Sequence, residues 1–165
     1  MRLRRLAIEI VQTVALTILA FYLLQTFVAQ PFRVEQGSMR QTLEPGQYVL
    51  ADKLTAPLTG YHRGDIVIFR PPSTWPGDAA GTPYIKRVIG LPGDKIEMKK
   101  GRLFINDQMV QRQEIEKAQT EDLYGHFGPV PTYIETLPNG VQHRIIEIQG
   151  DDGFNDNAGP FVVPQ

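Results

Sequence analysis

The chain has 165 residues, which is enough for one modest domain and a membrane anchor. Its formal net charge of −1 gives no electrostatic reason to expect a nucleic acid partner. It contains no cysteine, which excludes disulfides, a thiol nucleophile and zinc–thiolate sites. Fifteen glycines and thirteen prolines predict many turns and short strands rather than a helical bundle.

The first predicted element is a transmembrane helix over residues 6–29, a mostly apolar stretch that Pro31 is expected to close. As a helix it would be about 36 Å long, enough to cross a hydrocarbon core of ~30 Å. Arg2, Arg4 and Arg5 precede it, and this charge bias predicts that the N-terminus lies inside. The sequence therefore predicts a tail over residues 1–5, a single-pass anchor, and an outer domain over residues 30–165.

A cleaved signal peptide is the alternative interpretation of this segment. It requires small residues at positions −3 and −1 of a cleavage site. The best local candidate ends at Ala29, where the large Phe27 would occupy position −3. An uncleaved anchor is therefore the prediction that we prefer.

The outer domain is predicted to be mainly antiparallel β. Short apolar runs predict strands over residues 47–51, 65–69, 84–89, 95–98, 103–105 and 143–148. Turns are expected at Pro45-Gly46, Pro92-Gly93 and Asn139-Gly140. The continuous run over residues 66–69 is typical of a strand buried on both faces. Residues 111–119 alone show a helical period beyond the anchor, and we expect them at the surface.

Ser38 and Lys86 are the candidate catalytic residues. Ser38 follows Gly37 shortly after the predicted anchor, and Lys86 lies in an apolar run of β type. A serine hydroxyl needs a base to take its proton, and a lysine can be that base only when it is neutral. The ordinary lysine pKa is near ~10.4, and burial among apolar side chains lowers it. Strand alternation predicts that Tyr84 shares the face of Lys86 and that Arg87 points the other way.

Taken alone, these two residues are a weak signal, because Gly-Ser-Met is a common tripeptide and most lysines in apolar runs extend to water. The histidines His62, His126 and His143 leave a Ser–His pair open. None of them lies in a recognisable triad context, and each is expected to be an ordinary surface or turn residue.

Four ordered blocks resemble the bacterial type I signal peptidases. Residues 30–39 with Thr42-Leu43 resemble the nucleophile box, 64–69 the strand that follows it, 84–94 the lysine box, and 101–106 the next hairpin. The resemblance runs in the family's order from residue 1 to about 106, and more loosely to the end. It implies a signal-peptidase-like β-domain behind one transmembrane helix.

The resemblance also implies an activity, the removal of signal peptides from exported preproteins at the outer face of the cytoplasmic membrane. Ser38 would be the nucleophile and Lys86 the general base, with no cofactor or metal. The backbone N–H of Ser38 would form part of the oxyanion hole, and Gln36 is a candidate second donor where the family often has a hydroxyl. Gln41 replaces the usual proline and is expected to loosen the turn. Preprotein signal peptides and the lipid bilayer are the implied partners, and the secretion machinery is a further candidate.

The family pattern continues with a further strand and a Gly-Asp-Asn-Arg-like box beyond the point where this sequence stops. We therefore expect a C-terminally incomplete domain with little activity of its own. Asp65 and Asp94 lie within family blocks, and we assign them strand-end and turn roles. The acidic tract over residues 151–157 lacks the register of an EF-hand, and a solvated loop is expected there.

Two other functions stay open at this point. A self-cleaving Ser/Lys repressor would share the same pair of residues, but it predicts a DNA-binding domain where this chain has an apolar anchor. A membrane-tethered, catalytically inactive β-domain that binds peptides or envelope partners is the non-enzymatic alternative.

Overall fold

The computed structural model describes residues 2–72, 74, 81–121, 125–148, 153 and 156–165. Most of the tract over residues 151–157 therefore lies outside the described residues. The chain divides into two compact units, one formed by residues up to Arg33 with residues 48–60, and the other by residues 34–47 with 61–165.

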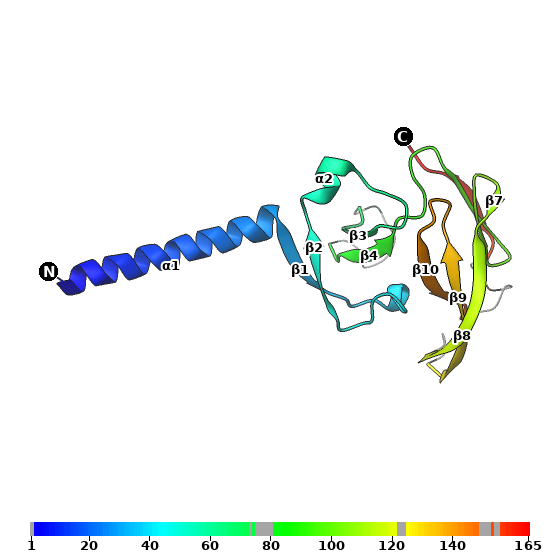
Figure 1. Ribbon diagram of the computed structural model, residues 1–165, viewed down its shortest axis with the longest axis horizontal. Helices are drawn as coiled ribbons and strands as arrows, with labels where there is room; N and C mark the ends of the chain where they lie inside the picture. The colour runs from blue at the N-terminus through cyan, green and yellow to red at the C-terminus, as the bar shows by residue number, and fades with distance from the viewer. Residues whose placement is uncertain (1, 73, 75–80, 122–124, 149–152, 154–155) are drawn as a thin grey trace. The chain divides into compact units, whose positions relative to one another are not determined.

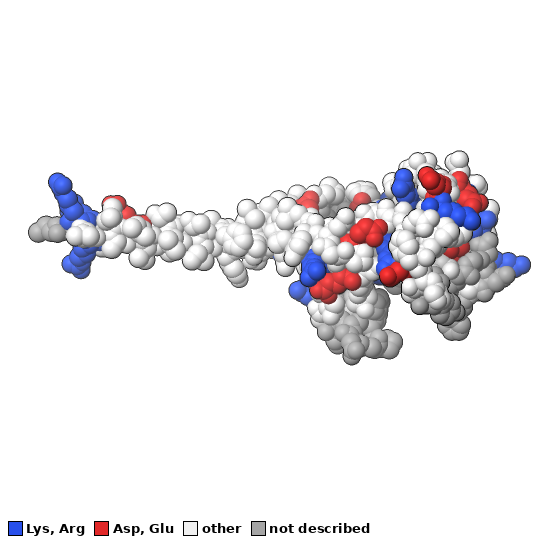
Figure 2. Space-filling view, turned by 90° about the horizontal axis from the view of Figure 1, so that it is seen from below, with Lys and Arg blue, Asp and Glu red and all other residues white. Residues whose placement is uncertain are grey.

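The first unit begins with helix α1 (Arg2–Phe27), in which none of the residues is buried. By length and composition this helix could cross a membrane. Figure 2 shows basic residues at its N-terminal end and an uncharged surface along most of its length. The helix ends at Phe27, so residues 28 and 29, which we expected within it, lie outside. Proline favours an extended residue before it, and Pro31 lies inside the strand that follows.

Strands β1 (Ala29–Arg33) and β2 (Tyr48–Asp52) pair antiparallel, and the short helix α2 (Thr55–Thr59) follows them (Figure 1). Lys53 connects this hairpin to the end of α1. Its Nζ donates to the backbone oxygens of Gln25, at 2.8 Å, and Thr26, at 3.3 Å. A lysine at a helix C-terminus satisfies carbonyls that have no partner within the helix.

The second unit contains three antiparallel sheets of short strands. One is the pair β3 (Ile66–Phe69) and β4 (Tyr84–Arg87). The second sheet has the order β11 (Ala158–Val162), β5 (Lys95–Lys99), β6 (Arg102–Ile105) and β7 (Gln108–Met109). The third has the order β10 (Gln142–Ile146), β9 (Phe127–Thr136) and β8 (Gln111–Glu121). The prediction of a mainly antiparallel β fold with one N-terminal apolar helix is confirmed.

The core of this unit is a cluster of buried aliphatic side chains from the second and third sheets and their connections. Its buried members are Leu103, Ile105, Val110 and Leu137, and Ile89, Ile96, Met98 and Val141 pack against them. The inward residues of β6 alternate along the strand, as a half-buried strand requires. The predicted turn at Asn139-Gly140 joins β9 to β10, and Gly140 has the positive φ that such turns demand.

Two predictions about individual elements are wrong. Residues 111–119, which showed a helical period, form strand β8 instead and pair with β9 along most of their length; most of them are exposed, as expected. Strand β3 is not buried on both faces, since Ile66 is 41% exposed and the other three residues are half-buried. Its apolar run packs within a two-stranded sheet rather than at the centre of a larger one.

Candidate active site

The turn that carries Ser38 is a single 3₁₀ turn, η1 (Gly37–Met39). The backbone oxygen of Met39 accepts hydrogen bonds from the amides of Thr42, at 3.0 Å, and Leu43, at 2.8 Å. The Met39 side chain is buried, with 8% of its surface exposed, and this anchors the turn in the fold. Ser38, its neighbour, is exposed.

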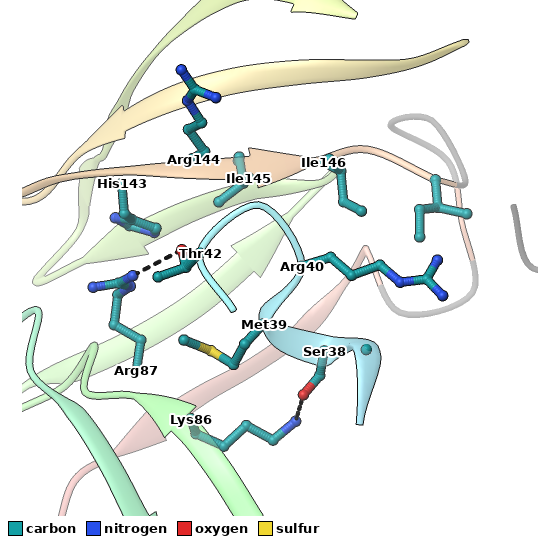
Figure 3. A pocket seen from close by; sticks show the side chains of 12 residues that line it. Ser38, Met39, Arg40, Thr42, Lys86, Arg87, His143, Arg144, Ile145 and Ile146 are labelled. Atoms are coloured by element: carbon teal, nitrogen blue, oxygen red, sulfur yellow. Dashed lines mark hydrogen bonds between the residues drawn. The ribbon is translucent and has the colours of Figure 1, made fainter. Parts of the chain in front are cut away.

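Strand β4 brings Lys86 to this turn. Lys86 lies opposite Val67 in the β3–β4 pair, and its Nζ lies 2.7 Å from the Oγ of Ser38 (Figure 3). This is a normal hydrogen-bond distance for two groups that are 48 residues apart in the sequence. The structure thus brings the two candidate catalytic residues together.

The surroundings of Lys86 disfavour its charged form. The side chain is half-buried, and desolvation by the protein lowers the pKa of its amine below the ordinary lysine value. The aromatic ring of Tyr84, on the same strand, lies 5.8 Å from Nζ, as alternation predicted. Lys86 is therefore better suited to accept a proton than a lysine in water.

Ser38 and Lys86 line a pocket of about 410 Å³ between η1, β4 and β10. It combines positive and aliphatic side chains, and no aspartate or glutamate is among the described residues that line it. The lining residues are Gly37, Ser38, Met39, Arg40, Thr42, Lys86, Arg87, His143, Arg144, Ile145, Ile146 and Ile148.

Arg87 does not point away from the pocket, so that prediction is wrong. Its guanidinium donates to the backbone oxygen of Gly64, at 2.7 Å, and to the Oγ1 of Thr42, at 3.2 Å. Arg87 is the last residue of β4, where the alternation of the strand no longer fixes the direction of a long side chain. The result is a second cation beside Lys86.

His143 is also not the surface residue that we expected. Its side chain is 8% exposed, lies on β10 and lines the pocket, and its Nε2 lies 3.2 Å from the Oε2 of Glu135 on β9. His62 and His126 are exposed, as predicted. Among the hydrogen bonds of the described residues, the contact to the Ser38 hydroxyl comes from Lys86 and not from a histidine.

Gln36 and Gln41 lie on either side of η1. Gln36 is extended and half-buried, without a side-chain capping bond to η1, and its part in an oxyanion hole stays a prediction. Gln41 has a φ of 72° and its amide donates to Glu44 Oε1 at 3.1 Å. A proline can adopt neither this φ nor this bond, so the turn is held by Glu44 instead.

The turn role of Asp94 is confirmed. Its Oδ2 accepts the backbone N–H of Leu91 at 2.6 Å and an N–H of Arg63 at 2.8 Å, and its Oδ1 accepts the amide of Asn106 at 2.8 Å. The hydrogen bond from Leu91, aided by those from Asn106 and Arg63, lowers the pKa of this buried carboxyl. Asp94 fixes the connection between the lysine-bearing segment and β5. Among the described residues, no group of three histidine, aspartate or glutamate side chains could hold a metal ion.

Comparison with known proteins agrees with this geometry. Residues 7–155 match the family model of signal peptidase, peptidase S26. The chain belongs to this family. The resemblance to type I signal peptidases is thereby confirmed, and both Ser38 and Lys86 lie within the part of the chain that matches.

Three curated relatives of this signal peptidase family are each described as a signal peptidase I. The protein from Rickettsia typhi is 31% identical over 168 residues, which cover 86% of this chain and 60% of the relative. Those from Rickettsia akari, at 32% over 169 residues, and Rickettsia prowazekii, at 32% over 168, are similar. The chain therefore spans about 60% of the length of these relatives.

Proposed function

We propose that this protein is a membrane-anchored serine endopeptidase that removes signal peptides from exported preproteins, with Ser38 as nucleophile and Lys86 as general base. The observation that carries the proposal is the 2.7 Å contact between Lys86 Nζ and Ser38 Oγ. Membership of the signal peptidase family and the lowered pKa of Lys86 support it. A nucleophile and a base within hydrogen-bond reach are the minimum that acyl transfer requires.

The proposed reaction runs through an acyl-enzyme. Neutral Lys86 takes the proton of the Ser38 hydroxyl as Oγ attacks the scissile carbonyl carbon, and the carbonyl oxygen becomes an oxyanion. The backbone N–H of Ser38, with the Gln36 amide as a candidate partner, would stabilise that charge. The C–N bond then breaks, and the leaving amine takes the proton from the Lys86 ammonium. Lys86 next takes a proton from water as the water oxygen attacks the ester carbon. The bond between that carbon and Ser38 Oγ then breaks, Oγ takes the proton back from Lys86, and the signal peptide leaves with a free carboxyl group.

The anchor supports the placement of this activity at a membrane. Helix α1 could span the bilayer, and the three arginines at its start favour an orientation with the N-terminus in the cytoplasm. The domain with Ser38 would then lie outside the cytoplasmic membrane. The substrate would be an extended peptide segment with small residues at positions −1 and −3, next to its own apolar helix.

The test is cleavage of a preprotein in detergent micelles by the wild-type chain and by Ser38→Ala and Lys86→Met. Each substitution should lower kcat by about 10²–10⁴-fold, and the double variant should be no slower than the worse single one, because the two residues act as one unit. Lys95→Met is the matched control, because Lys95 lies on β5, in another sheet than Lys86. Its side chain is 38% exposed and forms an ion pair with Asp107. If neither the wild-type chain nor any variant cleaves the preprotein, but all of them bind it, the result would favour the non-enzymatic β-domain instead.

A further inference from the structure

The turn that carries Ser38 is bonded to the far end of strand β8 through the side chain of Arg40. The Nη1 of Arg40 lies 3.1 Å from the Oγ1 of Thr120 and 3.4 Å from the backbone oxygen of Glu121. Its Nη2 lies 3.7 Å from the Oε2 of Glu121. These contacts join residues 80 and 81 positions apart in the sequence, and they connect the end of β8 to the turn that carries Ser38.

The path of this side chain passes directly over the turn. A Cβ atom on Gly37 would lie 2.9 Å from the Nε of Arg40, closer than real Cβ atoms come to such a neighbour, and 3.4 Å from its Cζ. Gly37, which has no side chain, leaves room for the Arg40 side chain in this position. The Arg40 side chain is 26% exposed and Thr120 is 8% exposed, so the contact is partly shielded from water.

Arg40 stands two residues after Ser38, and its own amide donates to the backbone oxygen of Gly37 at 3.1 Å. A displacement of its backbone therefore moves the serine hydroxyl. Because a shift of about 1 Å in a reacting group can cost ~10²-fold in rate, whatever fixes this turn affects catalysis. Figure 3 shows Arg40 extending away from Ser38 and Lys86, so it acts on the hydroxyl through the backbone.

We propose that Arg40 is a positioning residue, which holds the Ser38 hydroxyl at Lys86 by fastening the nucleophile turn to Thr120 and Glu121. The inference rests on the proposed function for its catalytic consequence, whereas the fastening itself is independent of any activity. The two parts are therefore tested separately.

The fastening is tested by amide hydrogen exchange in the full chain in detergent. Arg40→Met keeps an unbranched apolar stem but removes the charge and the fork of donors. The amides of Thr42 and Leu43, which donate to Met39, should exchange about 10- to 100-fold faster, as the loss of charge-assisted bonds implies. Arg102→Met, at a half-buried arginine on β6, is the control and should leave them unchanged. Unchanged exchange in Arg40→Met would overturn the proposal.

A milder variant protects the test against misfolding. Glu121→Gln preserves the shape of the partner and removes its charge, and it should produce a smaller increase in the same exchange rates. When it is combined with Arg40→Met, no further increase is expected, because both changes remove the same contact. If the two substitutions instead multiplied the exchange rates independently, Arg40 would act through a contact other than the one with Glu121.

The catalytic consequence is measured as separate kcat and KM values for peptide cleavage. Arg40→Met should lower kcat by roughly 10- to 100-fold and leave KM within about twofold, because a displaced hydroxyl reacts poorly but leaves the bound peptide in place. A merely structural role would lower the thermal midpoint without changing kcat of the folded fraction, and that result overturns the inference. If Ser38→Ala instead retains full cleavage, the proposed function fails, while the exchange rates still decide whether Arg40 fastens the turn.

Discussion

The proposed mechanism makes a specific prediction about pH. Only neutral Lys86 can accept the serine proton, so kcat/KM should rise tenfold per pH unit until the amine is deprotonated. Because burial lowers the pKa of Lys86, the midpoint of this rise should lie below the ordinary lysine value of ~10.4. A lysine with an unshifted pKa would be neutral in only about one molecule in a thousand near pH 7.4, and each unit of lowering multiplies that fraction by ten.

Met39→Ala is the perturbation that tests the physical cause. Met39 is 8% exposed and lines the pocket with Lys86, and Figure 3 shows the two side chains near each other. Its truncation admits water to the amine, which raises the pKa of Lys86 and moves the rise in kcat/KM to higher pH. Removal of a buried methionine costs about 2–5 kcal/mol in general, and we expect the lower end because Met39 borders an open pocket.

The assay is the initial rate of peptide cleavage at low substrate concentration, from about pH 6 to about pH 11, past the ordinary lysine pKa, at constant ionic strength. Met39→Leu is the matched control, since it conserves volume and should leave the midpoint in place. Thermal melts of each variant exclude unfolding as the cause. A wild-type midpoint at the ordinary lysine value, or a shift to lower pH in Met39→Ala, would refute the argument that desolvation tunes Lys86.

Two further predictions concern stability. Asp94→Asn should lower the free energy of unfolding by about 3–5 kcal/mol, because Arg63, whose side chain is 11% exposed, loses its carboxylate partner. Hydrogen bonds lower the pKa of Asp94, so its contribution to the free energy of unfolding is present above about pH 4 and is lost as the pH falls further. In urea denaturation, the free energy of unfolding of the variant should therefore depend less on pH in the acid range. Lys53→Met should weaken the junction after α1 by about 1–3 kcal/mol, because the carbonyls of Gln25 and Thr26 lose a charged donor. Faster amide exchange of Val28 and Lys53 would report this, and unchanged exchange would contradict it.

Local patterns in the sequence were enough to predict most of the short strands. Each run of apolar residues between turn signals, such as residues 95–98 and 103–105, lies in an observed strand with boundaries that differ by one or two residues. The turns at Pro92-Gly93 and Asn139-Gly140 follow from glycines that adopt a positive φ. These features depend on neighbours in the chain, which is why they can be read without the fold.

Strands β8 and β9 could not be predicted in this way. The stretch over residues 111–119 is mostly polar, and β9 contains Pro129 and Pro131, which argue against a strand when they are considered alone. The long pairing of the two strands compensates for weak local preference, and a register shift between Ile115 and Ala118 disrupts the alternation that would have revealed β8.

The contact between Ser38 and Lys86 is a long-range property, and composition or periodicity could not place it. The family resemblance supplied the pairing, and the structure supplies the distance. Neither indicated that Arg40 would bond to β8, because that contact depends on a strand that the sequence did not predict. The arrangement of Arg87 and His143 around the pocket was missed for another reason: local patterns predict β4 and β10 as strands but do not show how the two strands lie around the pocket.

The composition of the pocket explains how a lysine can serve as a base without a histidine partner. Arg87, Arg40 and Arg144 line the pocket with Lys86, and arginine stays protonated at any pH that a protein survives. The charged form of Lys86 is disfavoured by lost hydration, which lowers the pKa of its amine. No carboxylate is among the described lining residues, so none of them offsets the desolvation that favours the neutral amine. In the proposed mechanism, the 2.7 Å hydrogen bond between Lys86 and Ser38 then joins the neutral base to the hydroxyl that it deprotonates.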